Sequence, residues 1–177
     1  RKDALVAAAG FINKVPEIVK EYGNEFTVAT VGTIKVTPHS VNVIPGTCTF
    51  SLEIRDQSAE VMKLIENHLR QLLEDICKKY GVTSTFVPTS YHDPAPMSEL
   101  VRGTIEEAVK ELGIDYTVIP SGAFHDSLIM TSVFPTGMIF VPSKDGISHS
   151  RYEYTAPEDI ENGCNVLLNT VLKLDEK

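Results

Sequence analysis

The sequence has no excess of positive charge and no long apolar run. Its net charge is −8 at pH 7, whereas nucleic-acid binding requires a concentrated basic face that balances the phosphates. No apolar stretch approaches the ~20 residues that a membrane-spanning helix needs, and the start Arg1-Lys2-Asp3 is not that of a signal peptide. We therefore expect neither nucleic acid nor a membrane as a partner.

Cysteine is scarce, and its spacing argues against two kinds of site. The three residues, Cys48, Cys77 and Cys164, are odd in number and contain no Cys-x-x-Cys pair, unlike a disulfide framework or a cysteine zinc site. Free thiols are typical of a reducing compartment, so we predict a cytoplasmic protein. The chain also lacks an initiator methionine, and we interpret it as a piece of a longer protein.

Length and composition are those of a globular protein with one large or two small domains. Of the 177 residues, 42% are hydrophobic and 23% are charged, which suffices to bury a core. Pro88, Pro94 and Pro96 mark a linker. We therefore divide the chain into a first domain at residues 1–93 and a second domain at residues 94–177.

Hydrophobic periodicity predicts the elements of the first domain. Phe50, Leu52 and Ile54 alternate with polar residues, as on a half-buried antiparallel strand. Ser58 and Gly81 are a typical cap and stop for the helix between them. In order, the pattern predicts a helix at 2–22, a partly alternating segment at 26–36, a strand at 41–55, a helix between 58 and 81, and a strand at 82–87. This order corresponds to a ferredoxin-like βαββαβ unit without its first strand.

The second domain alternates helices with short apolar segments. Thr155-Ala156-Pro157-Glu158 has the composition of a capping box before the last helix. The pattern predicts a helix at 98–112, a strand at 115–119, a helix at 125–132, a buried strand at 134–141 and a final helix. Such alternation is typical of part of an α/β layer, so the fold class predicted for the chain is α/β.

Two loops carry the most informative pattern. The segment Pro142–Ser150 follows the apolar run Thr136–Val141 and places His149 on a polar loop that contains a glycine. Upstream, Pro120–Asp126 repeats the arrangement, with a glycine turn and His125 before a helix. In α/β proteins, ligands bind at the carboxyl ends of strands, so two such loops predict a site. Taken singly, His149 also fits a solvated loop residue, and His125 a helix cap or a core residue.

Together these segments resemble the zinc-dependent aminoacylase and carboxypeptidase superfamily. They are most similar to its branch of allantoate amidohydrolases and N-carbamoyl-L-amino acid hydrolases, which carries Ser-Gly-Ala-Gly-His-Asp-Ala and Pro-Ser-x-x-Gly-Ile-Ser-His segments. A third match is Pro38–Gly46 followed by Phe50–Asp56, so the resemblance covers nearly the whole chain. His39, Phe124 and Ser127 stand where the branch commonly has Asn, Gly and Ala, and these departures bear on the substrate.

The resemblance implies an architecture and a set of partners. Residues 1–93 would be a ferredoxin-like lid and dimerisation domain that lacks its first strand. Residues 94–177 would be the C-terminal part of an α/β zinc-hydrolase catalytic domain. The implied partners are a small-molecule carboxylate as substrate and a second copy of the protein, in a homodimer that forms through the lid domain.

The resemblance also implies roles for single residues. His149 would bind zinc or manganese, as one ligand of a site that holds two ions in the complete enzyme; the other ligands and the glutamate that activates water would lie outside this chain. Arg55 and Asn42 would hold the carboxylate and the amide of the substrate, in their own subunit's site or in a neighbour's. Without the resemblance, Arg55 more readily fits a solvated arginine paired with Glu53 or Asp56, and Asn42 a turn residue.

The loop at His125 would line the substrate pocket. Its backbone N–H groups at Ala123 and Phe124 would bind a substrate oxygen, and the bulky Phe124 ring would narrow the pocket. Glu153, which follows the second loop, either orients His149 or is a solvated carboxylate.

We therefore predict the C-terminal portion of a metal-dependent amidohydrolase that cleaves the carbamoyl or ureido C–N bond of a small carboxylate, either allantoate or an N-carbamoyl-L-amino acid. In the mechanism that the resemblance implies, metal-activated water attacks the carbonyl carbon. Two alternatives stay open: a dipeptidase or N-deacylase of the same superfamily, and a non-catalytic dimerisation module. We expect the isolated chain to be inactive, because an active zinc site needs about three protein ligands and a positioned base.

Overall fold

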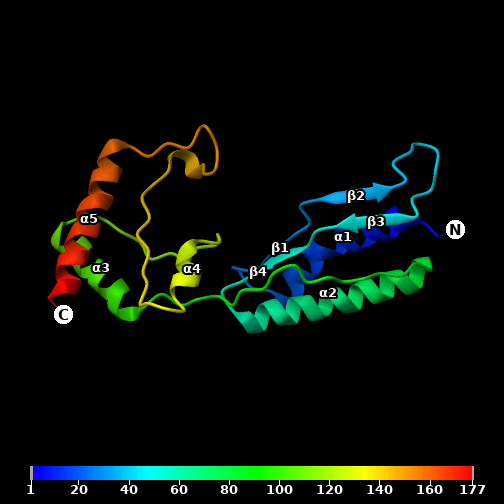
Figure 1. Ribbon diagram of the computed structural model, residues 1–177, viewed down its shortest axis with the longest axis horizontal. Coiled ribbons are helices and arrows are strands. Elements are labelled where there is room, and N and C mark those ends of the chain that lie inside the picture. Colours follow the sequence, from blue (N-terminus) through cyan, green and yellow to red (C-terminus); the bar gives the residue numbers. More distant parts are fainter. Residues whose placement is uncertain (1, 177) are drawn as a thin grey trace. The chain divides into compact units, whose positions relative to one another are not determined.

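The computed structural model describes residues 2–176, which form two compact units that divide between Pro94 and Ala95 (Figure 1). The first unit contains α1 (Ala4–Tyr22), β1 (Val28–Thr30), β2 (Ile34–Thr37), β3 (Thr47–Phe50), β4 (Glu53–Arg55) and α2 (Ala59–Tyr80). The second contains α3 (Glu99–Glu111), α4 (Asp126–Met130), a short 3-10 helix η1 (Lys144–Gly146) and α5 (Pro157–Asp175). Helices and strands are mixed, so the predicted α/β class is confirmed. None of the described helices is long and apolar enough to cross a bilayer.

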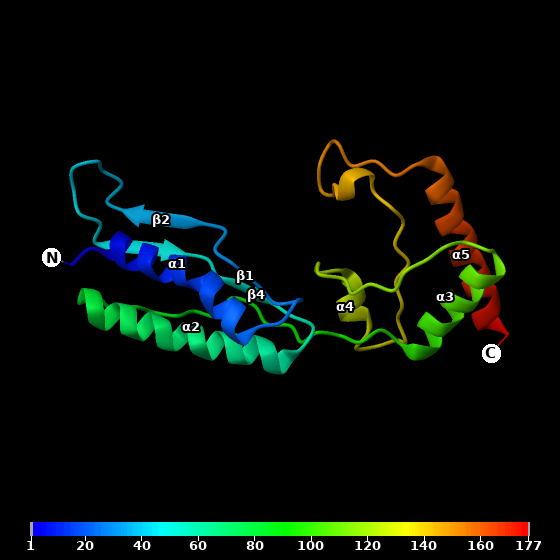
Figure 2. The same ribbon diagram turned by 180° about the vertical axis from the view of Figure 1, so that it is seen from behind.

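The two helices of the first unit arise from local signals and bury its core. The Ser58 side chain accepts a hydrogen bond from the N–H of Val61 at the start of α2, and Gly81 ends that helix in the left-handed conformation (φ 64°), as predicted. α1 and α2 lie side by side (Figure 2). The side chains at the centre of the core are Phe11, Val15, Ile65 and Leu69.

The strands form two antiparallel ladders that are segments of one bent hairpin. β1 pairs with β4, where Val28 lies opposite Arg55, and β2 pairs with β3, where Ile34 lies opposite Phe50. Six positions separate Val28 from Ile34, but only five separate Arg55 from Phe50. One extra residue in one strand is the mark of a β-bulge. The bulge falls at residues 31–33, and it divides the hairpin into its two ladders.

The predicted strand at 41–55 is wrong at its start. β3 begins at Thr47, and residues 38–46 form the loop between β2 and β3. The Gly46 N–H closes this loop by donating to the Thr37 carbonyl (3.0 Å). Beyond the loop, the predicted alternation is confirmed, because one set of alternating side chains packs against the core: Phe50, Leu52 and Ile54.

In the second unit, α3 packs against α5, and the extended segment 134–141 passes close to both helices. A Cβ added to Gly137 would lie 2.7 Å from Val101 Cγ1 on α3. A Cβ added to Gly163, on α5, would lie 2.6 Å from Val141 Cγ1. Side chains have no room at these two positions, so glycine is what allows the segment to approach the helices.

Three predicted strands and one predicted cap are not formed among residues 2–176. Residues 82–87, 115–119 and 134–141 belong to no ladder, because a strand requires a hydrogen-bonded neighbour, which an apolar pattern does not guarantee. α5 begins at Pro157 without a side-chain cap from Ala156; proline itself suits the first helical position, so the capping box is wrong. Since 82–87 is not a strand here, the ferredoxin-like arrangement stays a prediction.

Candidate functional site

His149 lies on a loop that internal hydrogen bonds hold in shape. This loop, called the His149 loop, runs from Ser143 to Tyr154, and the Lys144 N–H joins its ends by donating to the Tyr154 carbonyl (2.8 Å). Inside it, the Ser143 hydroxyl donates to the Ile147 carbonyl (2.6 Å). The polar sequence after segment 134–141 therefore forms a closed loop that carries an exposed histidine.

The backbone of His149 is in the left-handed region, with φ 53°. Residues other than glycine adopt this conformation rarely, and it costs free energy that the surroundings must offset. Here the His149 N–H donates to Oε2 of Glu153 (2.8 Å). Glu153 thus holds the main chain of the candidate metal ligand. The sequence predicted that Glu153 either orients His149 or is a solvated carboxylate, and neither prediction specified this backbone contact.

The described residues do not form a complete metal site by themselves. The exposed imidazole of His149 is a group that binds zinc, but nowhere between residues 2 and 176 do three His, Cys, Asp or Glu side chains gather around one point. Burial raises the pKa of the Cys48 thiol, which disfavours the thiolate that binds metals. This donor set fits one ligand of a metal site and not a whole site.

The second candidate loop presents aromatic rings beside a histidine. The His125 ring lies edge-on to the Phe140 ring, with 5.8 Å between their centroids and 65° between their planes, and Phe124 is 55% exposed. α4 is shorter than the predicted helix at 125–132, and His125 makes no side-chain capping bond to it. Since α4 is little more than one turn long, its dipole contributes little, and binding would rest on the loop's own backbone and rings.

Both loops belong to the second unit. In Figures 1 and 2 the loop before α4 and the His149 loop lie on the same side of that unit. A shared site at His125 and His149 requires this placement.

Arg55 lies on the face of β4 that is turned away from the core, and its side chain is 47% exposed. Its Nη2 donates to Oε1 of Glu53 (2.8 Å), which is on the same face of the strand. An exposed ion pair of this kind contributes about 0 to 1 kcal/mol, so a substrate carboxylate can replace Glu53 at low cost. The pairing is the one that the solvated interpretation predicts, while the planar guanidinium also suits a carboxylate.

Asn42 lies in the exposed loop between β2 and β3, where the Ser40 hydroxyl donates to Asn42 Oδ1 (2.7 Å). That loop follows the pair Thr37 and Thr47, whereas Arg55 is in the pair at the opposite end of the hairpin. The extended chain from Thr47 to Arg55 spans about 26 Å at 3.3 Å per residue. One copy of the first unit therefore does not bring Asn42 and Arg55 to the same small ligand.

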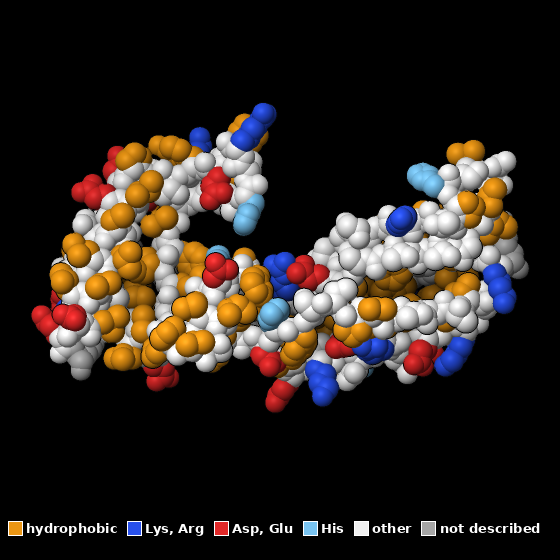
Figure 3. Space-filling view, in the orientation of Figure 1, with side chains coloured by type: hydrophobic (Ala, Val, Ile, Leu, Met, Phe, Trp, Pro, Cys, Tyr) orange, Lys and Arg blue, Asp and Glu red, His pale blue; other side chains and the backbone are white. Residues whose placement is uncertain are grey.

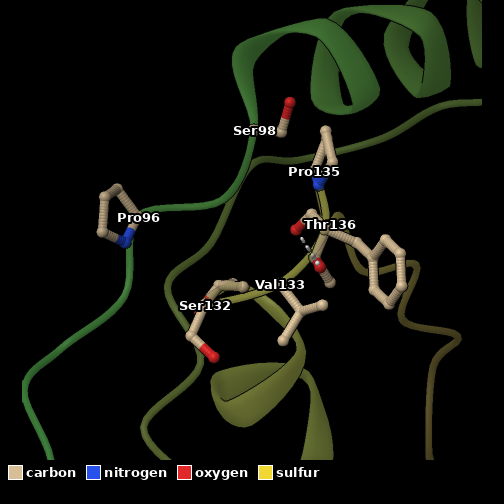
Figure 4. A pocket seen from close by; sticks show the side chains of 8 residues that line it. Pro96, Ser98, Ser132, Val133, Pro135 and Thr136 are labelled. Carbon is tan, nitrogen blue, oxygen red and sulfur yellow. Dashed lines mark hydrogen bonds between the residues drawn. The ribbon is translucent and has the colours of Figure 1, made fainter.

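A hollow of about 380 Å³ lies beside residues 131–136 of the second unit, and none of the predicted site residues lines it (Figure 4). Its hydroxyl groups are engaged locally: the Thr136 hydroxyl donates to the Phe134 carbonyl (2.9 Å), and the Ser132 hydroxyl to the Ile129 carbonyl (2.7 Å). The lining contains no titratable side chain. The hollow thus offers no acid, base or metal ligand.

Sequence reasoning missed two neighbours of the candidate residues. Ser40, two positions before Asn42, has a weak signal, because serine and asparagine at this spacing are common in turns. Phe140 is far from His125 along the chain and carries no signal, because only folding brings the two rings together.

The fold and these loops are those of a known group of hydrolases: the chain belongs to peptidase family M20/M25/M40, whose family model matches residues 8–173. It is 38% identical over 174 residues to an N-carbamoyl-L-amino acid amidohydrolase of Geobacillus stearothermophilus, covering 98% of this chain and 42% of the relative. It is 33% identical over 175 residues to an allantoate amidohydrolase of Bacillus subtilis, covering 98% and 42% of the two chains. The resemblance found in the sequence is confirmed.

The match extends to three dimensions. The crystal structure of AtUAH in complex with (S)-hydroxyglycine superimposes with a TM-score of 0.92 at 35% identity, covering 100% of this chain and 42% of that one. The chain thus spans less than half the length of the relatives it matches.

Proposed function

We propose that this chain is part of a metal-dependent amidohydrolase that cleaves the carbamoyl or ureido C–N bond of a small carboxylate. Allantoate and N-carbamoyl-L-amino acids are the proposed substrates. The observation that carries the proposal is the His149 loop, in which an exposed imidazole sits on a left-handed residue held by Glu153. The names of the relatives at 38% and 33% identity support the same bond as the target.

His149 would hold one metal ion, zinc or manganese. One solved member of the family, a Bacillus subtilis protein, is described as a dinuclear metal-binding peptidase, and a site with two ions in the complete protein is proposed in accord with it. A bound metal would polarise the carbonyl group and supply an activated water. The remaining ligands and the glutamate base would come from residues outside this chain, since the described residues provide one candidate ligand.

Arg55 would bind the substrate carboxylate, and Asn42 its amide group. Their positions at opposite ends of the hairpin support an assembly in which one copy's Asn42 and another copy's Arg55 serve one site. We therefore propose a homodimer that forms through the first unit, which would act as a ferredoxin-like lid. The loop with Phe124 and His125 would line the substrate pocket.

Ammonia release by the complete protein tests the reaction. With zinc or manganese added, allantoate and N-carbamoyl-L-amino acids should be hydrolysed faster than dipeptides and N-acetyl amino acids. Preference for the latter pair would support a dipeptidase or deacylase, and hydrolysis of none would support a non-catalytic module. The 177-residue chain assayed alone should release no ammonia, because residues 2–176 form no complete metal site.

Assembly is tested separately by light scattering. The complete protein should have twice the mass of one chain at micromolar concentration. A monomer would contradict the dimer and, with it, the sharing of Asn42 and Arg55 between copies.

A further inference from the structure

We propose that Thr27 and Asp56 form a latch that positions Arg55 for a carboxylate. Both residues are positioning residues that act through Arg55 and not by touching the substrate. The inference rests on the proposed role of Arg55 and adds to it the means by which the first unit fixes the direction of that side chain.

The latch is a connected set of short hydrogen bonds. The Thr27 hydroxyl donates to Oδ2 of Asp56 (2.5 Å) and accepts from the Asn24 N–H (2.8 Å). The other oxygen of the carboxylate, Oδ1, accepts from the Ser58 N–H (2.8 Å). Thr27 is only 7% exposed. A buried hydroxyl that both donates and accepts has one preferred geometry, so the carboxylate of Asp56 is held at a defined point.

The turn between α1 and β1, which carries Thr27, is tightly packed at Gly23. A Cβ added to Gly23 would lie 2.6 Å from the Val19 carbonyl oxygen and 2.8 Å from Thr27 Oγ1. Only glycine therefore fits at the end of α1. The path from α1 into β1 is thus closely determined on one side of the latch, and the start of α2 at Ser58 determines the other side.

The latch acts on Arg55 because of where it lies along the hairpin. Thr27 immediately precedes Val28, and Asp56 immediately follows Arg55; Val28 and Arg55 form the last pair of the β1–β4 ladder. The terminal pair of a ladder frays most easily, and the bond from Thr27 to Asp56 joins the two strands one residue beyond it. Without that bond, the backbone of Arg55 would be held from one side only.

Each carboxylate oxygen of Asp56 accepts a hydrogen bond within the latch, and this distinguishes Asp56 from its neighbour Glu53. Asp56 receives hydrogen bonds at both oxygens, while Glu53 pairs with the guanidinium in an exposed position. A half-buried carboxylate with hydrogen bonds at both oxygens is harder to displace than an exposed ion pair, which exchanges readily. The arrangement fixes the backbone of Arg55, while its guanidinium lies at the exposed surface of the hairpin.

A double-mutant cycle in the complete enzyme tests the latch. Thr27→Val removes the hydroxyl at nearly constant volume, and Arg55→Lys keeps the charge but removes the fork. We expect Arg55→Lys to lower kcat/KM by about 30-fold or more, and Thr27→Val to raise KM about fivefold with kcat within about twofold of wild type. In the Arg55→Lys background, Thr27→Val should change KM no further, because residues that act through one group are not additive. Thr27→Ser, which keeps the hydroxyl, should restore a low KM.

Thr170→Val is the matched control. Thr170 is 3% exposed and its hydroxyl donates to the Val166 carbonyl within α5 (2.7 Å), so this variant loses a buried hydroxyl far from Arg55 in sequence. Its KM should equal that of the wild type. If Thr27→Val does not fold, Asp56→Asn takes its place in the cycle.

The outcomes separate the latch from the proposed function. An impaired Arg55→Lys enzyme beside a folded Thr27→Val enzyme with unchanged KM would overturn the latch and leave the proposed function standing. Additive effects in the double mutant would also overturn it, because a general structural role does not act through Arg55. Normal kinetics of Arg55→Lys would overturn the carboxylate role itself, and the latch would fall with it.

Discussion

The first unit buries Phe11 and Leu69 almost completely between its helices and its hairpin, whereas the second leaves large apolar side chains along α5 open to solvent (Figure 3). Leu167 and Leu172 are each 55% exposed. In the first unit, the apolar faces of two helices and of the hairpin cover one another. In the second, two helices present more apolar surface than the unpaired extended segments cover. A regular apolar pattern therefore shows that a face is suited to burial. The pattern does not identify the surface that covers this face.

The same difference separates the candidate functional residues. Arg55 is part of a hydrogen-bonded ladder beside a packed core, so its direction depends on the folding of the whole first unit. His149 and His125 are on loops of the second unit, where His149 is exposed and His125 is half-buried. Substitutions should therefore affect stability and activity differently in the two units.

The largest expected effect is on activity, from His149→Ala in the complete protein. Loss of a metal ligand should lower turnover by about 10³-fold or more and reduce the bound metal. The melting temperature of the metal-free protein should barely change, because the imidazole is exposed. Metal analysis and ammonia release check this, with His92→Ala, another exposed histidine, as the control. Full metal content and turnover in His149→Ala would show that His149 is a solvated loop residue and not a metal ligand.

The next effect is on stability, and it compares one leucine from each unit. Leu69→Ala removes a side chain that is 0% exposed and should lower the free energy of unfolding by about 2 to 5 kcal/mol. Leu167→Ala, at an exposed position, should cost less than about 1 kcal/mol. Urea titration of the 177-residue chain measures both. Equal losses would mean that Leu167 is covered in solution and that the two units do not differ as described.

The smallest effect concerns acid stability in the second unit. Hydrogen bonds from Lys110 (2.7 Å) and then from Tyr116 (2.6 Å) lower the pKa of Glu106 from its ordinary 4.5. Since the folded pKa is the lower one, this stabilisation is present above about pH 4.5 and is lost as the pH falls through the folded value.

Glu106→Gln tests that contribution. The melting temperature of the variant should fall slightly less than that of the wild type between about pH 6 and about pH 3. Glu161→Gln, a charge-matched change on α5, should behave as the wild type does. Parallel pH profiles for Glu106→Gln and the wild type would show that the pair contributes nothing measurable.

Much of the local structure follows from the sequence. Ser58 and Gly81 predict the ends of α2, and the alternation of Phe50, Leu52 and Ile54 predicts which face of the hairpin is buried. These features depend on residues close together in the chain, where capping and side-chain period act directly. The motifs around His125 and His149 are likewise local, and they indicate the family without knowledge of the fold.

Other features were not predictable because they depend on distant residues. The segments 82–87, 115–119 and 134–141 have apolar composition, but a ladder needs a neighbour, and none pairs with them among residues 2–176. The start of the strand predicted at 41–55 was also wrong, because the bond between Gly46 and Thr37 decides where the loop ends.

The sequence by itself determined the α/β class, the helix ends, the buried face of the hairpin and the family of the chain. Only the tertiary structure decided the bulge that sets the register, the separation of Asn42 from Arg55, and the bond between Thr27 and Asp56. The physical reason is the range of the interactions. Caps and periodicity act within a few residues, whereas register and cross-strand hydrogen bonds join residues tens of positions apart. Those residues meet only when the chain folds.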